Sequence, residues 1–213
     1  MGGYVVHKYF SWFGLPGSMV LSGLLSLTAL VLALCFHSKD RWLCCAAMLL
    51  STIGDLFMAN FSSISEKLPV PSFYVGATFF IFAHILYIFT YRVLIRQNGF
   101  APVNPGFRAA VVFVLACGAL VIWKCFRNGN VDWAMLILCV IYMCIIGCNC
   151  AVIFSYAWSV KSIRSLAALG ALSFFLSDLI IGVEALTGYT TDFLWGMIWW
   201  LYPIGQFFII LPA

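Results

Sequence analysis

The chain has 213 residues, of which 64% are hydrophobic and 8% charged, with 11 Lys and Arg against 7 Asp and Glu. Water-soluble domains are about 45–50% apolar and about 25% charged, so this composition excludes a soluble globular domain. The net charge of +4 does not indicate a nucleic-acid partner, because most basic residues lie in short gaps between apolar segments, where they orient membrane helices. We therefore predict a single integral membrane domain over residues 1–213.

Apolar segments long enough to cross a bilayer occur seven times in the sequence. A hydrocarbon core about 30 Å thick requires roughly 20 mainly apolar residues per helix. The predicted spans cover residues 18–36, 42–60, 71–91, 109–126, 131–156, 163–186 and 193–211. The sequence thus predicts an all-α, polytopic transmembrane bundle, with a turn-rich loop between the third and fourth spans.

The basic residues between these spans predict the orientation of the chain. One side receives Lys8, Lys67, Lys124 and Arg127. The other side receives Lys39, Arg41, Arg92, Arg96, Arg108, Lys161 and Arg164. Because the cytoplasmic side carries the excess of positive charge, we expect the N-terminus outside and the C-terminus inside. The membrane is a bacterial inner membrane or that of the endoplasmic reticulum.

The nine cysteines lie in or beside the apolar segments. The sequence has no Cys-x-x-Cys pair and no set of His and Cys with the spacing of a zinc site. We expect these cysteines to pack as small apolar residues. No metal and no other cofactor is predicted.

Three ionisable residues lie inside the predicted spans, namely Asp55, His84 and Asp178. An Asp at the centre of a span costs about 2.5–3.5 kcal/mol on insertion scales, so it marks a functional site by default. Asp55 lies about 13 residues into the second span and Asp178 about 15 residues into the sixth. Both spans run outward from the cytoplasm, so we expect the two carboxyl groups to meet at similar depth.

Further polar residues share helical faces with these groups on the second and third spans. Ser51 lies one turn before Asp55, and Gly54 allows a neighbouring helix to approach closely. His84 and Tyr87 lie on one face of the third span, three residues apart. A buried His or Ser can also be a satisfied packing residue, so each of these positions has a structural alternative.

The fifth and last spans carry similar polar rows. Tyr142, Asn149 and Tyr156 recur every seven residues on the fifth span, and this row is expected mainly to pack between helices. Tyr202 and Gln206 lie one turn apart on the last span. Together with the second and third spans, these rows predict polar groups that converge on one interior.

The first span carries a row of small residues. Ser18, Ser22 and Ser26 follow one another at a spacing of four residues, on one helical face. Small residues on one face let two membrane helices approach closely. This row therefore predicts a packing seam and not part of the polar interior.

The segments around the two aspartates are weakly similar to each other. Residues 53–59 and 176–182 share a small residue, Asp and Leu in succession, followed by a small residue four places after the Asp. Each segment precedes a span with a polar row. This similarity indicates a parallel internal repeat of helix pairs.

Four short motifs, in order, resemble the lysoplasmalogenase-like (YhhN) family of polytopic membrane proteins. They are Gly54-Asp55, Ala-His-Ile-Leu-Tyr at 83–87, Gly-Ala-Leu-Ser-Phe-Phe-Leu-Ser-Asp at 170–178, and Tyr-Pro-Ile-Gly-Gln at 202–206. The resemblance extends over about residues 45–210. It implies eight spans, the additional one being a short N-terminal element. A lysine that relatives often carry at the start of the helix before the Gly-Asp helix is absent.

The resemblance also implies an activity and its site. The reaction is hydrolysis of the vinyl-ether bond of a lysoplasmalogen, which gives a fatty aldehyde and a glycerophospho-headgroup. The catalytic residues would be Asp55 and Asp178. The expected partners are this lysophospholipid and membrane lipids, and no protein partner is inferred.

Two buried carboxyl groups suit this chemistry. Protonation of the outer alkene carbon gives an oxocarbenium ion, to which water adds. Two carboxyl groups that share one proton supply both the acid and a stabilising anion. Phe174 and Phe175 precede Asp178 and favour that residue as the acid. The residues expected to hold the carboxyls, the substrate and the water are His84, Tyr87, Tyr202, Gln206, Ser51 and Asn149.

The phosphate of such a substrate would need a cation at the outer mouth of the site. Topology places three basic residues on that side, and we expect one of them to meet the phosphate. They are Lys67, Lys124 and Arg127.

Three other functions remain as alternatives. Intramembrane Asp and His also mark ion paths, as in a proton-coupled transporter of small molecules or lipids. The sequence has no pair of helices broken at the midplane, as carriers use, and Pro203 is a single interruption. An intramembrane aspartyl protease would carry Tyr-Asp and Gly-x-Gly-Asp motifs, which this chain lacks. The third alternative is a lipid-binding protein without catalytic activity.

Overall fold

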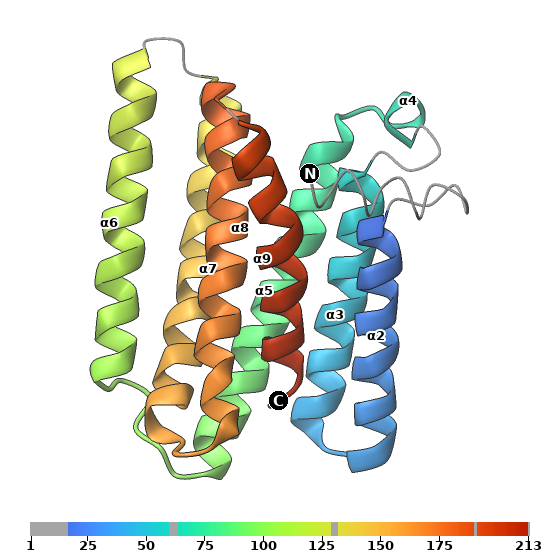
Figure 1. Ribbon diagram of the computed structural model, residues 1–213, viewed down its shortest axis with the longest axis vertical. Helices are drawn as coiled ribbons and strands as arrows, with labels where there is room; N and C mark the ends of the chain where they lie inside the picture. The colour runs from blue at the N-terminus through green and yellow to red at the C-terminus, as the bar shows by residue number, and fades with distance from the viewer. Residues whose placement is uncertain (1–16, 60–63, 129–131, 190, 213) are drawn as a thin grey trace. The chain divides into compact units, whose positions relative to one another are not determined.

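The computed structural model describes residues 17–59, 64–128, 132–189 and 191–212, and these residues form helices and connecting turns without a strand. The helices are α2 (Gly17–Phe36), α3 (Lys39–Met58), α4 (Ile64–Lys67), α5 (Ser72–Gln97), α6 (Pro105–Asn128), α7 (Trp133–Ser159), a 3-10 helix (Ile163–Leu166), α8 (Ala167–Thr187) and α9 (Asp192–Ile210). The prediction of an all-α bundle is confirmed (Figure 1).

Within the described part of the chain, six helices are long and apolar enough to cross a membrane, namely α3 and α5 to α9. They correspond to the second to seventh predicted spans. The first predicted span is helix α2, of which Val20–Phe36 is a shorter apolar stretch. The short N-terminal element that would be an eighth span lies outside the described residues. The helices support a multi-pass membrane protein, and the predicted orientation of its termini stays a prediction.

The helices fall into two compact units, which meet in the sequence between Val93 and Leu94. The first unit holds α2, α3, α4 and most of α5, and the second holds the end of α5 and α6 to α9.

In the first unit, the contact between α2 and α3 contains hydrogen-bonded hydroxyl groups in addition to small side chains. The Thr52 hydroxyl lies 2.8 Å from the Ser22 hydroxyl and 2.7 Å from the Ser26 hydroxyl. Ser26 also donates to the backbone oxygen of Met48 over 3.2 Å. Ser22 and Ser26 thus form a packing seam, as predicted, which is held together by interhelical hydrogen bonds, whereas the side chain of Ser18 lies outside the described part of the structure.

Helices α3 and α5 approach each other through two glycines. A Cβ on Gly54 would lie 3.2 Å from the backbone oxygen of Gly76, and a Cβ on Gly76 would lie 3.1 Å from that of Gly54. The ring of Phe80 on α5 also packs on Gly54, and its nearest carbon would lie 2.9 Å from a Cβ on Gly54. The prediction that Gly54 allows close helix approach is confirmed, and this approach brings the residues around Asp55 against α5.

In the second unit, α6 packs on α7, α7 on α8 and α8 on α9, so that neighbours in sequence are neighbours in space (Figure 1). The α8–α9 contact also depends on glycine. A Cβ on Gly170 would lie 2.9 Å from the backbone oxygen of Gly205, and one on Gly205 would lie 2.8 Å from the backbone nitrogen of Phe174. Helix α9 continues through Pro203, so this residue does not divide the last span.

The loop between α5 and α6 is held on α7 by polar side chains. Asn104 donates from Nδ2 to the backbone oxygen of Ser155 over 2.8 Å, and Ser155 donates from its hydroxyl to the backbone oxygen of Pro102 over 2.9 Å. Gly99 in this loop has a positive φ of 66°, a left-handed backbone conformation that glycine adopts without a steric cost. The predicted turn-rich loop is confirmed.

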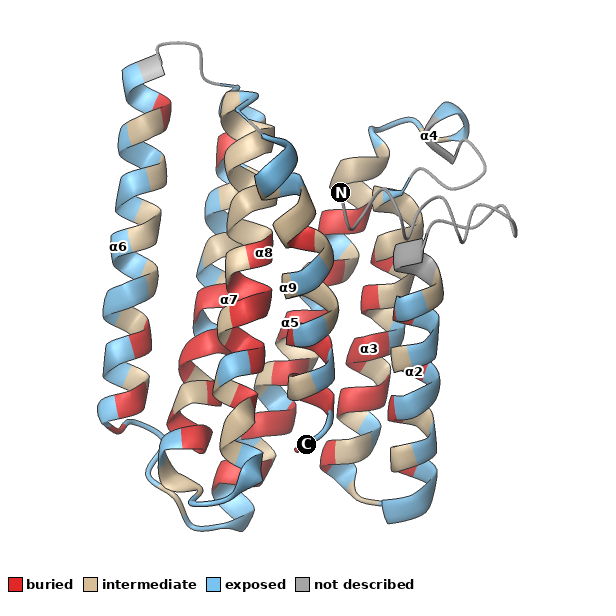
Figure 2. Cartoon of the chain, viewed as in Figure 1, coloured by how far each residue is buried: buried red, intermediate tan, exposed pale blue. Residues whose placement is uncertain are grey.

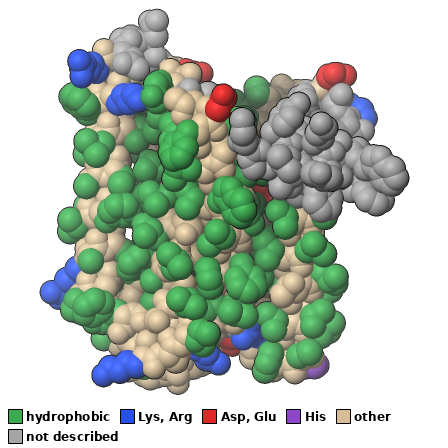
Figure 3. Space-filling model, viewed as in Figure 1, with side chains coloured by type: hydrophobic (Ala, Val, Ile, Leu, Met, Phe, Trp, Pro, Cys, Tyr) green, Lys and Arg blue, Asp and Glu red, His purple; other side chains and the backbone are tan. Residues whose placement is uncertain are grey.

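Large apolar side chains face outward on every long helix. On α6, Leu115 is 67% exposed and Trp123 is 59% exposed. Buried residues gather on the faces that the helices turn toward each other within a unit (Figure 2). In the space-filling view, hydrophobic side chains cover the sides of the helices and Lys and Arg lie near helix ends (Figure 3). Such a surface is suited to lipid and not to water.

Candidate functional site

Asp55 lies in the last turn of α3 and has Ser51 one turn before it. Tyr87 reaches this turn from α5 and is completely buried. Its hydroxyl interacts with the Ser51 side chain and lies within electrostatic reach of the Asp55 carboxyl. The same hydroxyl donates to the sulfur of Met48 over 3.5 Å. The structure therefore brings Ser51, Asp55 and Tyr87 together in the first unit.

His84 belongs to the same buried face of α5. It lies three residues before Tyr87, and the two ring centroids are 6.3 Å apart with an angle of 55° between the ring planes. Both side chains are completely buried. The close helix contact at Gly54 and Gly76 holds this face against α3, so the polar face predicted for the third span points into the first unit.

Asp178 lies on α8 in the second unit, and Tyr142 of α7 donates a hydrogen bond from its hydroxyl to Oδ2 of this aspartate. Tyr142 is a functional candidate that the sequence reasoning missed, because its row on the fifth span was assigned mainly to packing. The signal was the repeat of polar residues every seven positions. That repeat identifies a face of the helix but not the residue that the face meets.

Tyr202 and Gln206 form a second polar pair in this unit, on α9. Gln206 donates from Nε2 to the Tyr202 hydroxyl over 3.2 Å and is completely buried. The Tyr202 ring packs against Phe174 of α8, with centroids 5.3 Å apart. Phe174 lies one turn before Asp178, so the contact between α8 and α9 links the Tyr202 and Gln206 pair to the helix that carries this aspartate.

Asn149 and Ser177 are the buried polar residues nearest in sequence to the Tyr142 and Asp178 pair. Asn149 lies two turns after Tyr142 on the same face of α7 and is 2% exposed. Ser177 directly precedes Asp178, and its hydroxyl is buried without a hydrogen-bond partner among the described residues. Burying a hydroxyl without a hydrogen-bond partner lowers the stability of a fold by about 1–3 kcal/mol. The Ser177 hydroxyl can therefore still form a hydrogen bond, directly before the aspartate in the sequence.

The eight predicted site residues fall into two groups. The first unit holds Ser51, Asp55, His84 and Tyr87, and the second holds Asn149, Asp178, Tyr202 and Gln206. Asp55 lies 16 residues after Lys39, where α3 begins, and Asp178 lies 15 residues after Ile163, where its candidate span begins. The aspartates thus occupy similar positions along their own spans. Direct pairing of their carboxyl groups stays a prediction.

The basic residues predicted for the outer mouth include two that contact aromatic rings in the second unit. The Lys124 ammonium lies 4.2 Å from the centroid of the Tyr189 ring, and the Arg127 guanidinium carbon lies 5.5 Å from that of Trp123. A cation over an aromatic ring is attracted by the electrons of the ring face. Tyr and Trp are enriched at membrane interfaces, where one end of the side chain contacts lipid and the other contacts water. Lys67 is exposed on the short helix α4 of the first unit.

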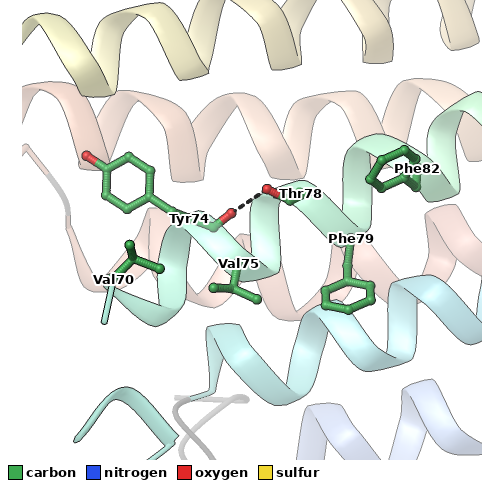
Figure 4. Close-up of a pocket in the computed structure, with 6 residues that line it drawn as sticks. All are labelled: Val70, Tyr74, Val75, Thr78, Phe79 and Phe82. Carbon is green, nitrogen blue, oxygen red and sulfur yellow. Dashed lines mark hydrogen bonds between the residues drawn. The ribbon is translucent and has the colours of Figure 1, made fainter. Parts of the chain in front are cut away.

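A pocket of about 300 Å³ lies along the start of α5, lined by Val70, Tyr74, Val75, Thr78, Phe79 and Phe82 (Figure 4). The Thr78 hydroxyl donates to the backbone oxygen of Tyr74 over 2.8 Å, so this polar group is satisfied within its own helix. Phe82 is 53% exposed, whereas His84 is completely buried. None of the eight predicted site residues lines this pocket.

Among the described residues, no three His, Cys, Asp or Glu side chains come together in a way that could hold a metal ion. The nine cysteines are free thiols, of which four are buried and three, namely Cys35, Cys144 and Cys148, are exposed. The candidate site therefore consists of carboxyl, phenol, imidazole, amide and hydroxyl groups. These groups can transfer protons and bind polar atoms of a substrate.

No curated protein and no solved structure gave a match. A model of the family described as the YhhN family matches residues 18–213. That match covers most of the chain and all four motifs noted above. The chain therefore belongs to the YhhN family.

Proposed function

We propose that this protein is a membrane hydrolase that cleaves the vinyl-ether bond of lysoplasmalogens. Membership of the YhhN family, the family of lysoplasmalogenases, supports the reaction class. One structural observation carries the proposal to particular residues: each intramembrane aspartate is influenced by a tyrosine hydroxyl from a neighbouring helix. The Tyr87 hydroxyl lies within electrostatic range of the Asp55 carboxyl, and the Tyr142 hydroxyl donates a hydrogen bond to Asp178. A polar site of this kind inside apolar helices is typical of function.

The proposed reaction begins with a proton transfer. One carboxylic acid of the aspartate pair donates its proton to the outer carbon of the alkene, the carbon–carbon double bond becomes single, and an oxocarbenium ion forms. The other aspartate, as its anion, stabilises this cation. Water then adds to the carbon that carries the ether oxygen and loses a proton to the anion. The product of this half of the reaction is a hemiacetal.

The second half of the reaction breaks the ether link. The hemiacetal hydroxyl loses its proton, the bond between carbon and the glyceryl oxygen breaks, and that oxygen takes up a proton. The products are a fatty aldehyde and a glycerophospho-headgroup, so one water molecule is consumed in total. Paired carboxyl groups serve glycosidases in the same way, because those enzymes also pass through an oxocarbenium-like state.

The other polar residues have supporting roles in this proposal. Tyr87 and Ser51 hold the Asp55 carboxyl, and Gln206 and Tyr202 bind the attacking water or the ether oxygen. His84 and Asn149 are proposed to bind polar atoms of the substrate or the water. Exclusion of bulk water by the surrounding helices strengthens the electrostatic stabilisation of the cation. The alkenyl chain of the substrate would remain in the hydrocarbon core of the membrane, against the exposed apolar side chains of the helices.

A proton-coupled transporter is the alternative that uses the same residues. Its carboxyl and imidazole groups would pass protons and not react with substrate. The continuous helix α9 counts against it, because carriers of this kind use helices that are broken near the midplane. The two functions differ in their products, so one experiment can separate them.

The test uses purified protein in detergent with a choline lysoplasmalogen and, as control, the acyl lysophosphatidylcholine of equal chain length. We expect aldehyde release from the vinyl ether only, at the same rate with and without EDTA. Mass spectrometry identifies the products. Proteoliposomes that move the lysolipid across the bilayer without forming aldehyde would support the transporter and overturn the hydrolase.

A further inference from the structure

We infer that one end of the second unit binds the headgroups of anionic phospholipids through four basic side chains. These side chains, here called the basic cluster, are Arg96, Arg108, Lys161 and Arg164. The inference goes beyond the proposed function, because the ligand is a membrane lipid other than the substrate and none of the eight predicted site residues belongs to the cluster.

The four residues come from segments that meet at one end of the second unit. Arg96 lies in the last turn of α5 and Arg108 in the first turn of α6. Lys161 follows the end of α7, and Arg164 belongs to the 3-10 helix, which contacts both α7 and α8. The loop between α5 and α6 and the connection between α7 and α8 lie at the same end of this unit (Figure 1). Basic side chains are visible there in the space-filling view (Figure 3).

The loop between Arg96 and Arg108 is fixed on α7 by packing as well as by the hydrogen bonds of Asn104. The Phe100 ring lies against the Tyr156 ring of α7, with centroids 6.4 Å apart. Gly106 packs so closely on α7 that a Cβ at this position would lie 2.8 Å from the Cβ of Trp158. The backbone that carries the cations is therefore already in place, so binding requires little further ordering of the chain.

The acidic residues of the second unit lie away from the basic cluster. Asp132 precedes α7 and Asp192 begins α9, both at the opposite end of the unit. Asp178 and Glu184 lie at least 11 residues after the start of α8, which is roughly 16 Å along the helix. All four basic side chains are exposed. This end of the unit thus presents four positive charges that no Asp or Glu side chain of the unit balances.

Exposed apolar side chains beside the cations indicate that the ligand is a lipid. Ile163, next to Arg164, is 73% exposed, and Trp158, three residues before Lys161, is 63% exposed. Val103 in the loop before α6 is exposed as well. Trp is enriched where the hydrocarbon core meets the headgroups. A lipid can contact the apolar side chains through its acyl chains while its phosphate meets the cations, whereas a soluble phosphate can use the cations only.

The chemistry of the basic cluster favours an anionic headgroup. The planar guanidinium of Arg presents a fork of N–H donors that matches two phosphate oxygens, and Lys adds a compact positive charge. A zwitterionic headgroup carries its own cation, which opposes the attraction. Clusters of about four to eight Lys and Arg directly beside membrane helices are typical of anionic lipid recognition.

The test follows thermal unfolding of the full-length protein in a non-ionic detergent. Dioleoylphosphatidylglycerol is added in steps, and dioleoylphosphatidylcholine serves as the control without net charge. A ligand that binds only the folded protein raises the unfolding midpoint. We expect phosphatidylglycerol to raise it in a saturable way that weakens with added salt, and phosphatidylcholine to leave it unchanged. An equal rise with both lipids would overturn the proposal.

Matched double variants show whether the basic cluster is the site. Arg108→Gln with Arg164→Gln removes two of its charges, and we expect the apparent Kd for phosphatidylglycerol to rise roughly 25-fold, about fivefold for each cation. Arg108→Lys with Arg164→Lys keeps the charges and should retain most of the affinity. Lys39→Gln with Arg92→Gln removes two exposed cations of the first unit and should change the Kd little. Equal losses in the two Gln variants would indicate general attraction to a positive protein and refute the site.

Glycerol 3-phosphate separates a lipid from a soluble ligand, because it has the phosphate without acyl chains. We expect no rise of the midpoint at the concentration at which phosphatidylglycerol saturates its effect. A rise of equal size would assign the basic cluster to soluble phosphates and overturn the lipid assignment. None of these arms measures hydrolysis. A protein that releases no aldehyde can therefore still confirm the lipid site, and an active hydrolase can still refute it.

Discussion

Gly170 packs so closely on Gly205 that a Cβ at residue 170 would lie 2.9 Å from the backbone oxygen of Gly205. The same arrangement occurs in the first unit, where Gly54 and Gly76 face each other between α3 and α5. Each aspartate-bearing helix thus packs through glycine on the next long helix that carries a polar row. The two glycines differ in register, since Gly54 directly precedes Asp55 whereas Gly170 lies eight residues before Asp178, so the parallel repeat of helix pairs stays a prediction.

We expect Gly205→Ala to lower the free energy of unfolding by about 1–3 kcal/mol, the usual cost of overpacking. The added methyl would meet backbone atoms of Phe174, which cannot move aside as a flexible side chain can. The midpoint of thermal unfolding in detergent measures the effect. Gly182→Ala on α8 and Gly196→Ala on α9 are matched controls, since nothing lies within 4 Å of a Cβ at either position. Equal midpoints for all three variants would contradict the close helix contact.

The Thr52 hydroxyl joins α3 to α2, and we expect Thr52→Val to destabilise the first unit. Interhelical hydrogen bonds in membrane proteins contribute about 0.6 kcal/mol on average and up to about 1.7 kcal/mol. Loss of Thr52 also leaves Ser22 and Ser26 without their shared partner, so we expect a loss of about 1 kcal/mol in a detergent unfolding titration. Thr28→Val is the control, because its hydroxyl donates to Leu24 within its own helix and is exposed. A larger effect of the control would contradict the role of Thr52.

Features that depend on one helix at a time could be predicted from hydropathy and helical spacing. These features are the six candidate spans, the loop near Gly99 and the close approach at Gly54, since small residues and apolar runs act locally. Helix limits differ from predicted span limits for a physical reason. Helix α3 begins at Lys39 and α5 continues to Gln97, because a helix with polar residues can extend beyond the hydrocarbon core into water.

Contacts between helices were less accessible to sequence reasoning. A repeat of seven residues placed Tyr142 on the face of Asn149, but not opposite Asp178, because the register between two helices depends on side chains of both. Thr52 lies three residues before Asp55 in the sequence, and its hydroxyl faces the serines of α2, a contact that helical spacing alone does not reveal. Phe174 and Phe175 suggested an apolar setting for Asp178, but a phenol hydroxyl donates a hydrogen bond to its carboxyl.

Lys124 offers a test of headgroup recognition. If its ammonium meets the phosphate of the lysolipid, we expect Lys124→Gln to raise KM about threefold to tenfold while kcat stays constant, a change of roughly 0.7–1.4 kcal/mol in binding. Lys124→Arg keeps a cation that can lie over Tyr189 and should restore most of the affinity. Lys161→Gln, which removes an exposed cation beyond the end of α7, is the matched control. Equal KM values for the two Gln variants would exclude Lys124 as the phosphate partner.

The aspartate pair is tested most directly by the two Asn variants and their combination. Asp55→Asn and Asp178→Asn keep the shape and polarity of the side chain but remove the acid and the anion, so we expect each to lower kcat by about 100-fold or more. Groups that act as one unit show grossly non-additive losses, so the double variant should be hardly slower than either single variant.

Asp192→Asn, at the exposed start of α9, should be fully active. Thermal unfolding of all variants shows whether the fold is kept. Losses that multiply in the double variant would indicate two carboxyl groups that act independently, and a folded single variant with most of its activity would refute the two-aspartate mechanism.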